Sequence, residues 1–176
     1  MANTLTPANP VFVKNTLNSF MELSAPIYID GSATWAAGEF LRRASDGLMY
    51  ECQTSNASGV GADSITHMAP IDHLTVTSGG VDTASQKFYI VKSTDVFEIN
   101  EVSTAAATLS QVGKKYGMTV SGNIDYLNVS SGTTNVVFKL IDPTWDNRPF
   151  QDNSTDQYPR WHVSVLEAAI SGTPAS

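Results

Sequence analysis

The feature that most limits the fold of this chain is a series of short apolar segments, each followed by a turn signal. Four of them stand in the second half: YGMTVSG, IDYLNVSSG, NVVFKLIDP and RWHVSVLEA. Each has the length of a strand, and glycine, proline or a Ser-Gly pair follows each one. Many short strands separated by turns are typical of antiparallel sandwiches and small barrels. We therefore predict a mainly β protein, built as a small antiparallel β-barrel or sandwich.

A β-hairpin is predicted in the first half. Strand-like segments at residues 39–43 and 48–53 flank a turn at residues 44–47. The turn contains Asp46-Gly47, a pair that readily adopts the positive φ angles of tight hairpin turns. The segment APIYIDG, which stops at Asp30-Gly31, predicts a further strand before the hairpin.

One short helix is predicted at residues 104–112, TAAATLSQV. Ser103 or Thr104 can cap its first turn, alanine favours the helix, and Gly113 suits the position after its end. Lys114 and Lys115 follow this glycine, as basic residues do near the negative end of a helix.

The Gly-Lys pair does not indicate a phosphate-binding loop. Such a loop needs a glycine five residues before Gly113 and a Ser or Thr after Lys114, and it opens a helix instead of ending one. Thr108 and Lys115 occupy those two positions.

Three regions are predicted from the distribution of these signals. Residues 1–24 form an N-terminal arm, residues 25–80 a small β subdomain with the hairpin, and residues 81–176 the main β-barrel domain. The boundary is placed at Ser78-Gly79-Gly80 because this stretch has the composition of a linker.

The N-terminal region leaves two interpretations open: a disordered terminus, or an extended arm that becomes ordered on a neighbour. It carries more apolar area than a solvated tail needs, which favours the arm. The residues predicted to contact a partner are Val11, Phe12, Val13, Leu17 and Phe20.

The composition bounds the partners. Charged residues make up only 15% of the chain and the formal net charge is −7, which argues against direct binding of nucleic acid. Apolar runs are shorter than a membrane span needs, and we expect no membrane association. Small polar residues replace the missing charge, which suits a surface covered by partner proteins. Cys52 is the single cysteine, so no intrachain disulfide can form, and synthesis in a reducing compartment is expected.

The candidates for chemistry do not predict an enzyme or a cofactor. His67 and His73, beside Asp63 and Asp72, match no zinc motif, and we expect polar loop residues there and no metal site. Cys52 lies between Glu51 and Gln53, which would not activate it as a nucleophile, so a buried structural cysteine is expected. His162 is expected to be a packed or surface histidine.

An aromatic and acidic loop is predicted at residues 142–160. Trp145, Arg148, Phe150 and Tyr158 are residue types found in interfaces and sugar sites, and packing over the end of a barrel is the other interpretation. The loop also holds four aspartates that leave a bound cation or a carboxylate hydrolase as further hypotheses: Asp142, Asp146, Asp152 and Asp156.

Taken together, several segments of the sequence resemble parts of the head decoration (cement) proteins of tailed bacteriophages. They are WAAGEFLRRASDGLMYECQT, TDVFEI, the Ala/Thr-rich segment, QVGKKYG, NVVFKLIDP and PRWHVSVLEA, spread over residues 25–168. The loop at 142–160 is long for this pattern.

The resemblance implies a structural protein on the capsid surface of the virion, made in the cytoplasm of a bacterial host. Such a protein adds to an assembled head, bridges copies of the major capsid protein and stabilises the shell against DNA pressure. Self-association is implied, with trimers favoured and dimers the alternative. The second hypothesis is a receptor- or glycan-binding β-domain of a phage fibre.

Overall fold

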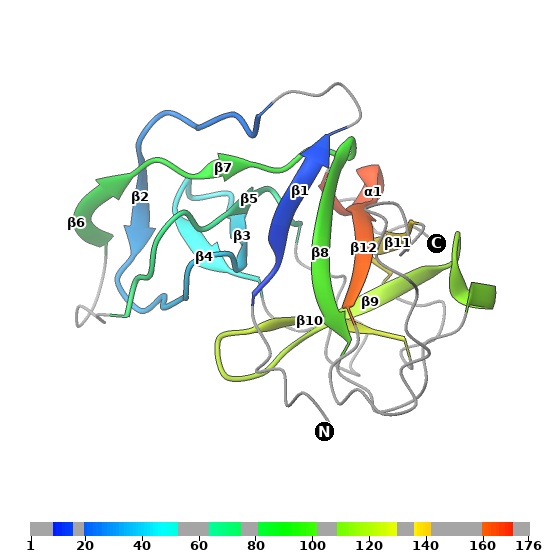
Figure 1. Ribbon diagram of the computed structural model, residues 1–176. Helices are drawn as coiled ribbons and strands as arrows, with labels where there is room; N and C mark the ends of the chain where they lie inside the picture. The colour runs from blue at the N-terminus through cyan, green and yellow to red at the C-terminus, as the bar shows by residue number, and fades with distance from the viewer. Residues whose placement is uncertain are drawn as a thin grey trace.

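The computed structural model describes residues 9–15, 20–52, 64–74, 81–101, 109–129, 136–141 and 160–170. Within them the strands form two sheets that lie side by side (Figure 1). One sheet closes into a five-stranded barrel and the other curves into a half-barrel. The prediction of a mainly β fold with a small barrel is confirmed.

The barrel is built from the second half of the chain. Its strands are β8 (Asp95–Glu101), β9 (Lys115–Val120), β10 (Asp125–Asn128), β11 (Phe138–Leu140) and β12 (Arg160–Val165). They pair in the order β8-β10-β9-β11-β12, and β12 returns to β8 to close the barrel. The β8–β10 pair is parallel and the other pairs are antiparallel.

The half-barrel has the strand order β6-β2-β4-β3-β5-β7. Its strands are β2 (Ile27–Asp30), β3 (Phe40–Arg43), β4 (Met49–Glu51), β5 (His67–Met68), β6 (Val81–Gln86) and β7 (Tyr89–Ile90). Strands β3 and β4 form the predicted hairpin, and Gly47 in its turn has a φ of 87°. The hairpin prediction is confirmed.

The change from one sheet to the other falls between β7 and β8. The predicted linker at residues 78–80 lies outside the described residues. Strands β6 and β7 follow it in sequence and pair with β2 and β5, so by pairing they belong to the half-barrel.

Residues 104–108 of the predicted helix lie outside the described residues. Of residues 104–112 the structure describes the end, where Leu109–Gln111 form a 3-10 turn, η1, and Gly113 follows with a φ of 82°. The helix α1 is Glu167–Ile170, in a segment that we predicted to be strand. The strand pattern ends at Leu166, whose carbonyl accepts the amide of Ala169, and Glu-Ala-Ala have high helix propensity.

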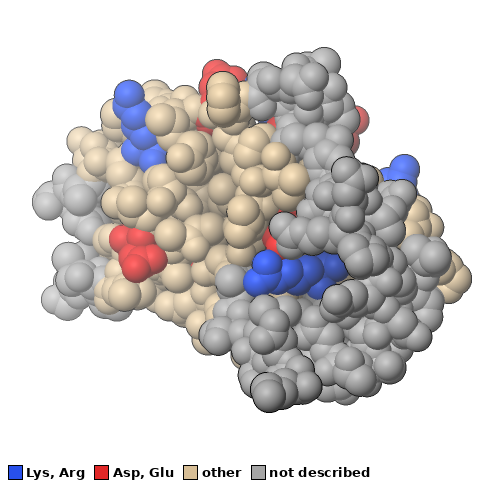
Figure 2. Space-filling view, viewed as in Figure 1, with Lys and Arg blue, Asp and Glu red and all other residues tan. Residues whose placement is uncertain are grey.

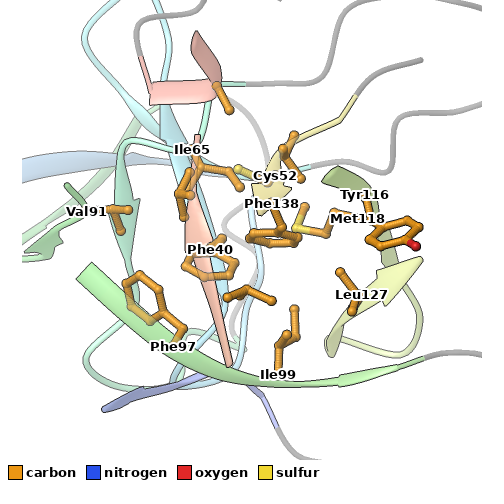
Figure 3. Close-up of a cluster of buried hydrophobic side chains, with 14 of the residues drawn as sticks. Phe40, Cys52, Ile65, Val91, Phe97, Ile99, Tyr116, Met118, Leu127 and Phe138 are labelled. Atoms are coloured by element: carbon orange, nitrogen blue, oxygen red, sulfur yellow. The ribbon is translucent and has the colours of Figure 1, made fainter. Parts of the chain in front are cut away.

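Strand β3 is the wall between two apolar cores. Phe40 belongs to the larger core, which fills the barrel and extends between the sheets, whereas Leu41 belongs to a smaller core inside the half-barrel. This follows from the alternation of side chains along a strand. Figure 3 shows Phe40 between Phe97 and Phe138. The centre of the Phe40 ring lies 5.1 Å from that of Phe97 and 5.6 Å from that of Phe138.

Among the helices that the structure describes, none is long and apolar enough to cross a membrane.

Candidate interface along the N-terminal segment

The N-terminal segment begins as a strand on the barrel. Strand β1 (Val11–Asn15) pairs antiparallel with the first half of β8, opposite Asp95–Glu98. On the same edge of β8, β10 pairs with Asn100 and Glu101, while β12 occupies the opposite edge. Thus β1 completes an edge that β10 covers only in part, and it lies in front of the barrel in Figure 1.

The outer edge of β1 has no partner strand in the part of the chain that the structure describes. The register shifts between Phe12 and Lys14, which leaves Val13 as the extra residue of a bulge. Bulges are a common way to limit uncontrolled pairing at an open edge. The open edge is therefore short and irregular.

Just before β1 the chain crosses the junction of the two sheets. The Asn9 side chain accepts the Asp125 amide at 3.1 Å and donates to the Asn123 carbonyl at 3.0 Å. On the other side, the Pro10 carbonyl oxygen lies only 2.9 Å from the position that a Cβ on Gly38 would occupy. Asn9 and Pro10 therefore touch the barrel and the half-barrel together.

Further along, residues 22–24 run beside β7 and cover its edge. The Ile90 amide donates to the Glu22 carbonyl and the Ser24 amide donates to the Phe88 carbonyl, both at 2.8 Å. The Glu22 carboxylate also pairs with Lys92 at 2.8 Å. The segment that we predicted to be an arm is thus bound to its own chain at residues 9–15 and 22–24.

The side chains of this segment divide between the body and the solvent. Phe12 and Met21 pack against the larger core, and the Phe12 ring meets Phe97 edge-on at 6.0 Å. Their neighbours point outward, since Val11 is 56% exposed and Phe20 is 94% exposed. We call Val11, Phe20 and the half-exposed Leu23 the outer face of the segment.

One face of the half-barrel carries little charge. Seen as in Figure 1, the described part of the half-barrel is mostly uncharged, with few acidic or basic side chains (Figure 2). A weakly charged surface binds proteins without the desolvation of many charges.

Two buried acidic residues lie at or next to the residues that the N-terminal segment contacts. Glu39 is the residue just before β3, and Asp125 is the first residue of β10. Both are nearly inaccessible to solvent. Asp125 accepts the Phe40 amide at 2.5 Å, and Glu39 accepts the Ala36 amide at 2.5 Å. Each sheet thus contributes one acid to the junction.

The surroundings of these acids favour their protonated forms. Burial raises the pKa of Glu39 to about 7; the Ala36 amide opposes this rise, and the charges of Glu51 and Asp72 add to it. Burial also raises the pKa of Asp125 well above its ordinary value. The hydrogen bond from the Phe40 amide lowers this pKa, and the charge of Glu39 raises it further. An acid next to another acid in a dry site holds its proton more tightly.

A third buried carboxyl group belongs to Glu101, the last residue of β8. It accepts the indole N–H of Trp161 at 2.8 Å, and burial raises its pKa. Its contact fixes a large core side chain, so it serves the barrel and not the N-terminal segment.

Groups of three or more residues with the geometry of a metal site are absent from the described residues. Our expectation that His67 and His73 are loop residues is wrong for His67, which is buried in β5 and whose pKa burial lowers to about 4. His73 forms an isolated bridge with Trp35 and stacks on its ring. Cys52 is buried, as expected.

The predicted contact residues are only in part described. Val11, Phe12 and Val13 lie in β1 and Phe20 follows it, whereas Leu17 lies outside the described residues. The four predicted loop residues Trp145, Arg148, Phe150 and Tyr158 also lie outside them, as do the aspartates of that loop.

Asn9, Gly38, Glu39 and Asp125 were not predicted to act together. The Asx-Pro pair at Asn9 and the isolated Gly38 are local turn signals, and neither carries information about the other.

Comparisons with protein families, with curated proteins and with solved structures find no match to this chain.

Proposed function

We propose that the protein is a structural capsid decoration (cement) protein. It binds the outer surface of an assembled phage head, bridges major capsid proteins and resists the pressure of packaged DNA. The observation that supports this most is the division of the N-terminal segment into two faces. Phe12 and Met21 hold it to the body, whereas Val11 and Phe20 face outward next to an open strand edge.

The proposed binding mode is strand addition to β1 together with burial of the outer face. Backbone hydrogen bonds along the edge supply affinity, and the outward apolar side chains supply specificity. The major capsid protein is the proposed partner, and self-association as a trimer, or as a dimer, multiplies weak contacts through avidity. In this function the protein is not an enzyme and needs no cofactor.

Phe20 tests the proposal because its side chain is almost fully exposed, so its replacement should change binding far more than folding. We expect Phe20→Ser to weaken binding to heads by about tenfold or more, as removal of an aromatic anchor does at interfaces. The free energy of unfolding should change by less than about 0.5 kcal/mol. The measurement is co-sedimentation with expanded, undecorated heads of the phage that carries the gene.

Tyr28→Ser is the matched control. Tyr28 is also an exposed aromatic residue, at 55%, but it lies on β2 and outside the N-terminal segment. If the wild-type protein and the Phe20 variant bind heads equally well, the outer face is not part of the interface. Deleting the whole segment is a poorer test, because it removes β1 and the Glu22–Lys92 ion pair as well.

A glycan-binding role is the second candidate, and one observation favours it. The outer side of the half-barrel carries Tyr28 and Tyr50, and the Arg42 guanidinium lies 4.8 Å from the centre of the Tyr50 ring. Tyrosine and arginine are common in recognition surfaces. A glycan array would support this role if wild-type protein binds a sugar and the Tyr28 variant does not.

A further inference from the structure

The N-terminal segment contacts the two sheets close to two buried acids, Glu39 and Asp125, that can gain or lose a proton. Asn9 accepts the backbone amide of Asp125, and Pro10 lies against Gly38, the neighbour of Glu39. The segment therefore contacts the backbone of Asp125 and the residue before Glu39. Because the two acids come from different sheets, a change at either one reaches the point where the segment holds the sheets together.

The groups that face the two acids are themselves acidic or neutral. Glu51 on β4 and Asp72 in the stretch 69–74 raise the pKa of Glu39, and Glu39 raises that of Asp125. From the N-terminal segment, Asn9 contacts the Asp125 backbone amide and is neutral. Asp72 accepts the Ala37 amide, so its charge is held close to the turn that carries Glu39.

The basic residues of β3 are engaged elsewhere. The Arg42 guanidinium lies over the Tyr50 ring, and Arg43 donates to the Gly47 carbonyl. Among the described residues, it is the backbone amides of Ala36 and Phe40 that lower the pKa values of the two acids. Loss of the protons would leave two like charges in a dry junction, and opening of the segment would let water reach them.

We propose that Glu39 and Asp125 form a proton-controlled latch for the N-terminal segment: protonated, they hold it on the body, and deprotonated, they release it. The inference concerns the regulation of the proposed interface and depends on that function for its biological meaning. Release near neutral pH moves β1 off β8 and so displaces the open edge and the outer face that the proposed interface uses. The latch therefore weakens that interface as the pH rises.

The direction of the pH effect follows from linkage. Glu39 has an ordinary pKa of 4.5 and a pKa of about 7 in the closed junction, so the closed form binds the extra proton between these values. Opening therefore becomes easier as the pH rises through this window, by about tenfold per unit for one proton, and levels off above about pH 7. Asp125 acts in the same direction, because its pKa is also raised.

Hydrogen exchange of the free protein tests the latch without any capsid. We expect the opening equilibrium of the β1 amides, corrected for the intrinsic exchange rate, to rise at least about tenfold from pH 5 to pH 7. Amides of β12 report the barrel itself and should rise much less. A flat profile for β1 in the wild-type protein would overturn the proposal.

Two variants assign the effect to the junction. Glu39→Gln keeps an oxygen for the Ala36 amide, and Asp125→Asn keeps one for the Phe40 amide, so each removes a titrating group but retains its contact. Each variant should lower the slope of the β1 profile, because one of the two titrating groups is gone, and the second serves if the first does not fold. Glu22→Gln, in the exposed ion pair with Lys92, is the control and should keep the wild-type slope. A wild-type slope in both junction variants would contradict the latch. Failure of capsid binding with an intact pH profile would instead count against the proposed function alone.

Discussion

Replacement of Phe40 by alanine is expected to lower the free energy of unfolding by about 3–5 kcal/mol, the usual range for a fully buried phenylalanine. Phe40 is inaccessible to solvent, and its ring contacts Phe97 on β8 and Phe138 on β11. The side chain comes from the half-barrel but fills the barrel core. Its loss therefore leaves a cavity at the place where the two sheets depend on each other. Urea unfolding followed by tryptophan fluorescence measures the change.

Phe88→Ala is the matched control for this prediction. Phe88 is equally inaccessible, but it belongs to the smaller core inside the half-barrel and meets Trp35 edge-on. Both variants should be destabilised. Hydrogen exchange should accelerate in both sheets for the Phe40 variant and mainly in the half-barrel for the Phe88 variant. Equal patterns in the two variants would show that Phe40 does not couple the sheets.

The barrel and the hairpin were predictable because their signals are local. Turn residues such as Asp46-Gly47 fix where strands end, and a run of short strands favours a closed sheet. The pairing of strands is not local. Strand β1 lies about eighty residues from β8 in sequence, and nothing in VFVKN indicates which strand it joins. The same distance separates Phe40 from Asp125, whose contact links the two sheets.

The acids of the junction were missed for a second reason. Aspartate and glutamate are rarely buried, so Glu39 and Asp125 look like surface residues in the sequence. Their burial results from the packing of one sheet against the other, which no short pattern records. The helix α1 was missed because the strand pattern of RWHVSV continues into Leu166, and only the hydrogen bonds show where the strand stops.

The N-terminal segment was predicted as an apolar contact region, and its structure refines which side chains are available. Alternation alone would place Val11 and Val13 on one side of the strand and Phe12 on the other. The bulge at Val13 breaks this pattern, and Val13 is half-buried while Val11 is exposed. Phe20 is therefore the better candidate for a partner contact, whereas Phe12 serves the fold. The prediction that these residues contact a capsid stays open to the binding experiment.

Replacement of Gly38 by alanine is expected to lower the free energy of unfolding by about 2–5 kcal/mol. Gly38 has a φ of 88°, which a side chain disfavours by about 1–2 kcal/mol. Its new Cβ would also stand 2.9 Å from the Pro10 carbonyl oxygen and 3.0 Å from the Asn9 Cβ. One of those contacts is with backbone, so the N-terminal segment must move away.

Gly113→Ala separates the two contributions. Gly113 has a similar φ of 82°, but a Cβ there would meet nothing within 4 Å. It should therefore lose only the conformational part, about 1–2 kcal/mol. The excess for Gly38→Ala over Gly113→Ala measures how firmly the segment is held on the junction, and only the Gly38 variant should speed hydrogen exchange in β1. If both variants lose the same free energy of unfolding and hydrogen exchange in β1 is unchanged, the segment moves away from Gly38 at no energetic cost. The latch would then have nothing to hold, because Glu39 and Asp125 act through the same contact.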